Sequence, residues 1–177
     1  MPVADDVAPT NEMNEVGPAH GAAIIAALKR AGVGFVLSVP DIVTSQHLLW
    51  PIAEDPTFRL IRVCKEDEAF GIAAGLSVCD RRAVLLIQQT GLLDSLNALR
   101  AVGVELEMPV CALVGLQGRE ANLEPEASAA YGVRIIAPIL DAMGVAHSLV
   151  ETTDEATKIA EIIDDAYRRS RPAVVFL

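Results

Sequence analysis

The segment RRAVLLIQQTGLLDSLNALRAVGVEL, residues 81–106, contains the clearest structural signal in the chain. Its first part, 81–89, is an apolar run with a polar end, which is typical of a strand buried on both faces. Its second part, 91–106, has the residue spacing of a helix. A buried strand followed by a helix is the repeating unit of a parallel sheet, because parallel strands need a crossover connection.

The same alternation continues on both sides of this segment. Further strands are predicted at 34–40, 58–64, 108–116, 145–151 and 172–177, and further helices at 18–31, 44–53, 66–79, 133–143 and 154–170. Pro51 is expected to interrupt the second helix, and Thr153 or Asp154 to cap the last one. We therefore predict one three-layer α/β/α domain over 18–177, with a mainly parallel sheet of about six strands.

Composition restricts the class of protein further. The 177 residues suit one domain with a core, and 52% of them are hydrophobic. No apolar run approaches the ~18 residues that a membrane span needs. The excess of apolar residues therefore indicates buried strands and a surface that packs against a partner. The net charge of −10 would repel a phosphate backbone, so nucleic acid is not an expected partner.

Two further features indicate a cytoplasmic protein. Residues 1–17 are acidic and lack the basic-then-apolar order of a secretory signal, so we predict a flexible leader. Cys64, Cys79 and Cys111 are odd in number and widely spaced, which favours reduced thiols over disulfides. No residue spacing indicates a metal site in this chain.

Polar residues follow three of the predicted strands, where ligands of open α/β sheets bind. The segments are SVPDIVTSQ (38–46), CKEDEA (64–69) and QQTGLLDSLN (88–97). In the second segment, Glu66, Asp67 and Glu68 open a helix, and such acids often only complement the helix dipole. Small residues behind them allow a close contact with another surface, where a partly desolvated acid could transfer protons. These small residues are Ala69, Ala73, Ala74 and Gly75.

Two patterns resemble the pyrimidine-binding (PYR) domain of thiamine-diphosphate enzymes. The first is E-x-x-A-x-x-x-A-x-G, at Glu66, Ala69, Ala73 and Gly75. The second is Q-x-x-G-x-x-x-S-x-N, at Gln88, Gly91, Ser95 and Asn97. With the early SVP loop, 38–40, the resemblance runs from about residue 18 to the end. Within that family the sequence is most similar to the decarboxylases of sulfopyruvate and phosphonopyruvate.

The resemblance implies roles for individual residues. Glu66 would hydrogen-bond N1′ of the aminopyrimidine and so activate thiamine diphosphate for decarboxylation of a small 2-oxo acid. The pyrimidine pocket or substrate cleft would be lined by Gln88, Gln89, Thr90 and Gly91. The substrate would meet Ser38, Pro40, Asp41 and His47. Helix capping and turn chemistry are the alternative interpretations of these polar residues, and Asn97 is expected to make only a local hydrogen bond.

The resemblance also implies a second polypeptide. The diphosphate-binding half of these enzymes holds Mg²⁺ and the phosphates with a G-D-G…N motif, and the sequence contains no G-D-G. A PP-type β subunit with that motif is therefore expected to bind the metal, in an α₂β₂ or larger assembly. Two other functions stay open, a carboligase subunit and a non-catalytic PYR-like scaffold. A flavodoxin-like module would require a glycine-rich phosphate loop, which is lacking.

Two features leave the substrate and one loop undecided. The related decarboxylases have a small residue where Asp41 follows Pro40 here, and a Gly-Asn pair where this chain has Leu93-Asp94. The charge of Asp41 would repel a sulfonate or phosphonate, which keeps a less charged 2-oxo acid open. The polar segment 117–132 is long enough for a functional loop, in which Arg119 and Glu120 could reach the active site or a partner, but a solvated loop is the favoured interpretation.

Overall fold

The computed structural model describes residues 16–121 and 123–177. Within these residues, six strands form one sheet in the order β2-β1-β3-β4-β6-β5, and every neighbouring pair is parallel. The prediction of an α/β fold with a parallel sheet is thus confirmed. The strands are β1 (Phe35–Ser38), β2 (Arg59–Arg62), β3 (Ala83–Gln88), β4 (Cys111–Gly115), β5 (Ala146–Leu149) and β6 (Ala173–Phe176).

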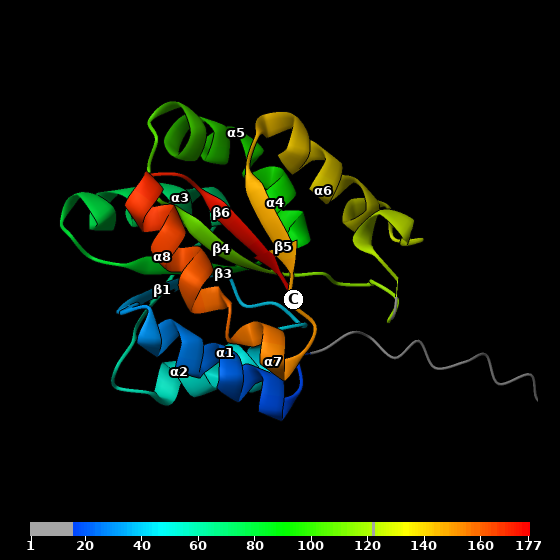
Figure 1. Cartoon of the computed structure of the whole chain (residues 1–177), viewed down its shortest axis with the longest axis horizontal. Helices are drawn as coiled ribbons and strands as arrows, with labels where there is room; N and C mark the ends of the chain where they lie inside the picture. Colours follow the sequence, from blue (N-terminus) through cyan, green and yellow to red (C-terminus); the bar gives the residue numbers. More distant parts are fainter. Residues whose placement is uncertain (1–15, 122) are drawn as a thin grey trace, which may run out of the picture.

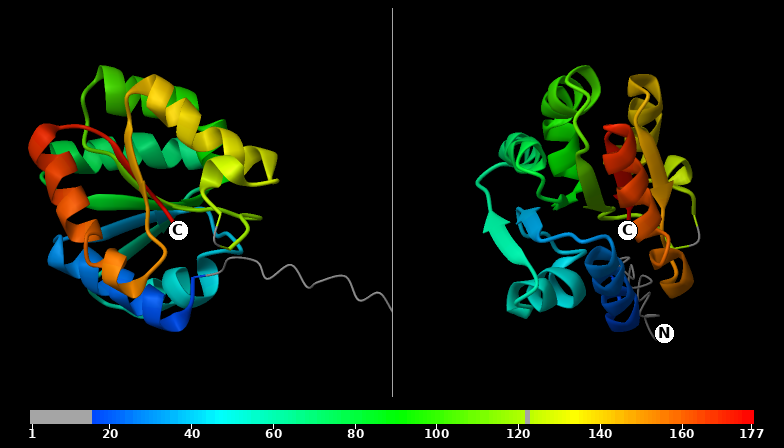
Figure 2. Two further views of the ribbon diagram at one scale, coloured as in Figure 1. Left: turned by 45° about the vertical axis from the view of Figure 1, so that its right-hand side comes forward. Right: turned by 60° about the vertical axis from the view of Figure 1, so that its left-hand side comes forward.

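Helices cover both faces of the sheet (Figures 1 and 2). One apolar core lies between the sheet and α1 (Pro18–Arg30), α2 (Trp50–Glu54), α7 (Thr153–Ala156) and α8 (Ile159–Arg169). The other lies between the sheet and α3 (Glu66–Val78), α4 (Gln89–Asp94), α5 (Leu96–Ala98) and α6 (Tyr131–Met143). Shorter turns are the π-helical η1 (Ser45–Leu49) and η2 (Leu99–Glu105) and the 3₁₀ turn η3 (Pro125–Ala127).

Strands β3 and β4 alternate toward the two cores, which explains their continuous apolar sequences. Leu86 faces the core with α1, whereas Leu85 and Ile87 face the core with α3. Every residue of β4 is buried. These central strands are therefore fixed by burial on both faces, as the sequence predicted.

Several helices differ in detail from the predictions. Pro51 does not interrupt the helical run, since η1 continues directly into α2 and Pro51 is the second residue of α2. The last helix begins earlier and divides, since Thr152 and Glu155 form a capping box at α7 and α8 starts at 159. The helix after β3 starts at Gln89 and is interrupted at Ser95.

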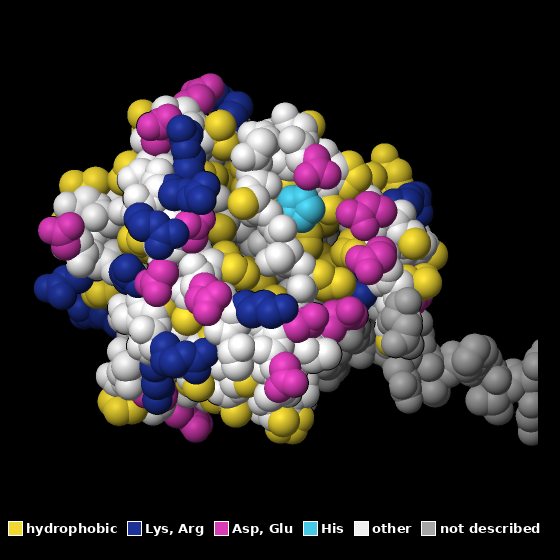
Figure 3. Space-filling model, viewed as in Figure 1, with side chains coloured by type: hydrophobic (Ala, Val, Ile, Leu, Met, Phe, Trp, Pro, Cys, Tyr) yellow, Lys and Arg dark blue, Asp and Glu magenta, His cyan; other side chains and the backbone are white. Residues whose placement is uncertain are grey.

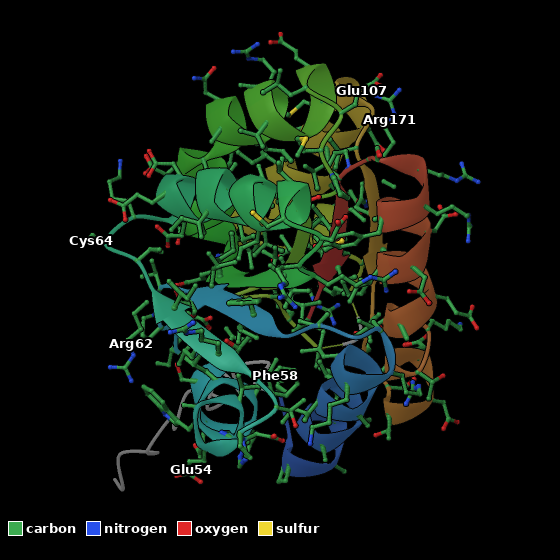
Figure 4. The ribbon with its side chains drawn as sticks, turned by 90° about the vertical axis from the view of Figure 1, so that its left-hand side faces the viewer. Glu54, Phe58, Arg62, Cys64, Glu107 and Arg171 are labelled. Atoms are coloured by element: carbon green, nitrogen blue, oxygen red, sulfur yellow. The ribbon has the colours of Figure 1, made fainter. Side chains whose placement is uncertain are left out.

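Exposed polar residues lie at two margins of the sheet. At the β2 margin, Arg62 and Cys64 lie on the outside of the molecule, where Figure 4 labels them. At the amino edge, Glu107 and Arg171 form a 2.6 Å ion pair between the segments that precede β4 and β6 (Figure 4). Within the described residues, no helix combines the length and the apolarity that crossing a bilayer requires.

The predicted leader lies mostly outside the described residues, which begin at Val16. Val16 itself is 6% exposed and packs in the core beside α1. Its backbone N–H donates to the carbonyl of Val43 at 3.2 Å. Val16 is thus part of the folded domain.

Candidate functional site

The three polar loops meet at one edge of the sheet. Strands β2, β1 and β3 are neighbours and parallel, so their carboxyl ends lie side by side. The chain crosses from one side of β1 to the other between β2 and β3, and such a reversal in strand order is where α/β sheets bind ligands. The segments 38–46, 64–69 and 88–97 therefore surround one position.

Glu66 and Gly91 are in direct contact at this position. A Cβ atom built on Gly91 would lie 2.1 Å from Glu66 Oε1 and 2.4 Å from Glu66 Cγ. The Glu66 side chain therefore occupies the space that any other residue at 91 would fill. Gly91 is buried and Glu66 is half-buried, which leaves the carboxylate at the surface of the sheet edge. The second and third loops are joined by this contact.

The three acids at the start of α3 have different environments. Glu68 Oε2 accepts a hydrogen bond from the Cys64 backbone N–H at 3.1 Å, so Glu68 closes the helix terminus. Asp67 lies 3.9 Å from Lys65, whose ammonium also pairs with Asp94 at 3.1 Å. The hydrogen bond with Asp94 raises the pKa of Lys65, with smaller contributions from neighbouring acids. Glu66 alone extends over the backbone of the next helix.

Gln88 and Gln89 connect the ends of β3 and β4. The Gln89 side chain accepts from the Gln117 N–H at 2.9 Å and donates to the Gln117 carbonyl at 3.0 Å. Gln88 Nε2 donates to Gln117 Oε1. Gln89 is 4% exposed and Gln88 is half-buried, whereas Thr90 is exposed. Gln89 thus has a structural role, and Gln88 and Thr90 border the edge.

The first loop is organised around the carboxylate of Asp41. Asp41 Oδ1 accepts from the N–H groups of Val43 and Thr44 at 2.7 and 2.9 Å, and Oδ2 accepts from Thr44 Oγ1 at 2.6 Å. Ser38 is fully buried, and its hydroxyl donates to the Leu86 carbonyl at 2.7 Å. This is the turn chemistry that the sequence offered as the alternative for both residues. Pro40 is exposed on the same loop.

We expect Asp41→Ala to destabilise the protein by about 2–3 kcal/mol, because two backbone N–H groups and one hydroxyl lose a charged acceptor. Asp41→Asn keeps an Oδ1 acceptor and should lose less than half as much. Urea unfolding of the two variants measures both values. If Asp41 instead served the substrate, the Ala variant would unfold like the wild type and change only KM.

The first loop also covers the end of β4. A Cβ atom on Gly115 would lie 2.9 Å from Val43 Cβ and 3.2 Å from Thr44 Cγ2, so only glycine allows this approach. His47 follows in η1 and is half-buried, and its carbonyl packs against Gly21 of α1. The loops after β1, β2, β3 and β4 are thereby joined into one layer.

The segment 117–132 is more ordered than its polarity predicted. Arg119 is 2% exposed, and its guanidinium donates to the Leu123 carbonyl and to Glu151. Glu120 accepts from the Ser128 hydroxyl at 2.7 Å and from the Ala129 N–H at 3.1 Å. The expectation of a solvated loop is wrong for Arg119, because long-range pairing with Glu151 after β5 replaces water.

The small residues of α3 divide between two faces. Ala69 and Ala73 are buried in the core against the domain's own sheet, so they are not part of an external contact face. Gly71 and Gly75 are exposed, and a Cβ on either would meet nothing within 4 Å. Val78 is 73% exposed on the same helix. The outward face of α3 therefore combines glycine with exposed apolar surface.

Ser95 and Asn97 of the PYR-like signature, and the histidines outside it, have local environments. Ser95 is fully buried, and its hydroxyl has no partner within 16–121 and 123–177. Asn97 Oδ1 accepts from Arg100 at 3.0 Å, as the local interpretation predicts. His20 bonds the Glu151 carbonyl at 3.0 Å, and burial lowers its pKa. His147 pairs with Asp141 at 3.1 Å.

Of the three thiols, only Cys64 belongs to the loops at this edge. Cys111 is buried, which raises its pKa to about 12, and Cys64 and Cys79 are exposed free thiols.

A cavity of about 680 Å³ lies between α8 and β5. Figure 3 shows basic and acidic side chains interspersed over this face, with hydrophobic atoms between them. In the described part of the chain, no group of three His, Cys, Asp or Glu side chains is placed to bind a metal.

Comparison with known proteins finds relatives that match nearly the whole chain. A protein named sulfopyruvate decarboxylase subunit alpha, from Methanothermobacter thermautotrophicus, is 30% identical over 156 residues, which cover 88% of this chain and 93% of the relative. The chain belongs to the sulfopyruvate decarboxylase alpha-subunit family. The family member of the same name from Methanocaldococcus jannaschii is 28% identical over 155 residues, 86% of this chain and 89% of the relative.

A longer relative and the subunit names add information on assembly. A Methanosarcina acetivorans protein named sulfopyruvate decarboxylase is 27% identical over 157 residues, and these cover 87% of this chain but 38% of the relative. No protein-family model matches the chain. The name "subunit alpha" in this decarboxylase family implies a partner subunit.

Proposed function

We propose that this chain is the pyrimidine-binding subunit of a thiamine-diphosphate-dependent sulfopyruvate decarboxylase. The single observation that supports it most is the seating of Glu66 over Gly91, at the crossover edge of the sheet. Glu66 would exchange a proton with N1′ of the aminopyrimidine. In the same helical turn, Glu68 caps the helix and Asp67 lies near Lys65. Glu66 instead extends over Gly91, which the helix dipole alone does not explain.

The residues at this edge fit an aminopyrimidine ring. Gly91 leaves room for the Glu66 side chain, and the carboxylate has an accessible surface that could receive a ring nitrogen. Bound thiamine diphosphate would supply the electron sink for loss of carbon dioxide from a 2-oxo acid. Glu66 would hold and move the proton, Gln88 and Thr90 would border the ring or the substrate, and Gln89 would hold the loop in place.

A sulfonate-bearing substrate is compatible with Asp41. Asp41 is 8% exposed, and its carboxylate accepts three hydrogen bonds from its own loop. These donors offset its charge locally, so the repulsion expected from the sequence is reduced. The names of the relatives then favour sulfopyruvate over a less charged 2-oxo acid.

We further propose that a diphosphate-binding partner completes the site and holds Mg²⁺. Two observations support a partner at α3, the exposed glycines 71 and 75 and the exposed Val78 beside them. The Methanosarcina relative is consistent with this, because the matched region is 38% of its length. The partner would cover the carboxyl edge and exclude water from Glu66, which strengthens a hydrogen bond there.

Removal of the cofactor and the partner tests this function. We expect the complex of this chain with its partner to release carbon dioxide from sulfopyruvate only when thiamine diphosphate and Mg²⁺ are present. Dialysis against a chelator should abolish turnover, and both components together should restore it. Calorimetry should detect binding of thiamine diphosphate to the complex and not to this chain alone. Undiminished turnover after complete removal of the cofactor would contradict the proposal.

A further inference from the structure

Gln117 contacts two residues of the candidate site, although the sequence pattern predicts no role for it. It lies two residues after β4, and its backbone N–H and carbonyl both bond the side chain of Gln89, at 2.9 and 3.0 Å. This reciprocal pair is inside the protein, since Gln89 is 4% exposed. Both polar ends of the buried Gln89 amide are thereby satisfied, which makes the pair costly to break.

The side chain of Gln117 makes a separate contact with Gln88. Gln117 Oε1 accepts a hydrogen bond from Gln88 Nε2, and both side chains are half-buried at the sheet edge. The pairing follows from strand register, because Gln88 ends β3 opposite Gly115, which ends β4. One residue thus binds two consecutive residues of the neighbouring strand end, one through its backbone and one through its side chain.

These contacts also determine the position of the Gly91 backbone, against which the Glu66 side chain packs; we call this surface the seat of Glu66. Gln89 is the first residue of α4 and Gly91 is the third. Anchoring Gln89 to the end of β4 fixes where α4 begins, and this in turn fixes the Gly91 backbone over which Glu66 extends. A shift of Gly91 would move the surface against which the carboxylate rests.

The loop that carries Gln117 is itself held on both sides. The Leu116 N–H donates to the Leu177 carbonyl at 3.1 Å, which joins the loop to the end of β6. Arg119 is almost completely buried and bonds Leu123 and Glu151. Gln117 therefore lies between two fixed points and can serve as a rigid support.

We propose that Gln117 is a positioning residue of the site. Its backbone holds the start of α4 and hence the seat of Glu66, and its side chain sets the orientation of the Gln88 amide toward the bound ring or substrate. This inference rests on the proposed function and adds a residue to it. Gln117 acts through Gln88 and Gln89, and no contact of its own with the reacting atoms is required.

The side-chain part can be isolated, because Gln117→Ala leaves the backbone pair with Gln89 intact. In the complete complex with thiamine diphosphate and Mg²⁺, we expect Gln117→Ala to lower kcat/KM for sulfopyruvate about 5- to 20-fold. Gln117→Glu keeps an acceptor for Gln88 Nε2 and should recover most of that loss. Glu126→Gln, an exposed change in the same segment, is the matched control and should behave like the wild type.

A double-mutant cycle separates positioning from a general structural effect. Gln88→Ala combined with Gln117→Ala should be no slower than the slower single variant, with Tm values of all variants within a few degrees. Additive losses, or no recovery in Gln117→Glu, would overturn the inference. The proposed function is tested separately, by whether turnover of the wild-type complex depends on the cofactor. If the wild type depends on the cofactor and Gln117→Ala is as active as the wild type, only the role of Gln117 is overturned.

Discussion

The Glu66→Gln complex is expected to decarboxylate sulfopyruvate at least about 100-fold more slowly than the wild type, because it loses the group that transfers the proton. Glutamine has nearly the same shape, so it still fits over Gly91 and the fold should be retained. The amide cannot exchange a proton with a ring nitrogen at neutral pH. Steady-state kinetics in the reconstituted complex measures the loss, which should appear in kcat.

Two neighbouring acids provide matched controls for this result. Asp67→Asn and Glu68→Gln remove the same charge from the same helical turn. If the acids acted only on the helix dipole, all three variants would lose a similar ~0.3–1 kcal/mol of stability and little activity. We expect only the change at 66 to reduce kcat strongly. Equal activities of the three variants would favour the non-catalytic scaffold.

The second large effect is expected for Gly91→Ala. The added Cβ would lie 2.1 Å from Glu66 Oε1, so the Glu66 side chain must turn away. Turning a flexible side chain costs little, and alanine favours the helix by about 1 kcal/mol relative to glycine. We therefore predict a stability close to that of the wild type together with a loss of kcat of about 100-fold, the size of the loss at Glu66.

A control and a double variant make this prediction specific. Gly132→Ala in α6 places a Cβ 3.6 Å from Leu93, which is an ordinary contact, and should leave turnover unchanged. Because Gly91 acts through Glu66, the double variant with Glu66→Gln should be no slower than Glu66→Gln alone. Full activity of Gly91→Ala would show that the observed seat of Glu66 is irrelevant to catalysis.

Burial explains why the fold could be predicted from the sequence. The apolar runs of β3 and β4 are continuous because these strands face a core on each side, and such runs have few other interpretations. The parallel order then placed the loops after β1, β2 and β3 at one edge. The helix interruption at Ser95 could not be predicted, because no glycine or proline lies at that position.

The site was predictable only in part, because its contacts depend on side-chain directions and on residues far apart in the sequence. Glu66 could be singled out by resemblance, but its difference from Asp67 and Glu68 depends on side-chain directions that spacing does not reveal. Gln117 was missed and the burial of Arg119 was not predicted, because Gln88, Gln89 and Glu151, with which they pair, are 28 or more residues away in the sequence. A polar segment is read as solvated when its partners cannot be identified.

The contact between Glu66 and N1′ is the central claim, and a structure of the complete complex with thiamine diphosphate and Mg²⁺ tests it most directly. The quantity to measure is the distance from the Glu66 carboxylate to N1′. We predict a hydrogen bond of about 2.5–3.2 Å, with Gly91 beneath the Glu66 side chain and the partner subunit covering the ring. A Glu66 carboxylate that faces solvent, away from the ring and from the partner, would contradict the proposed function.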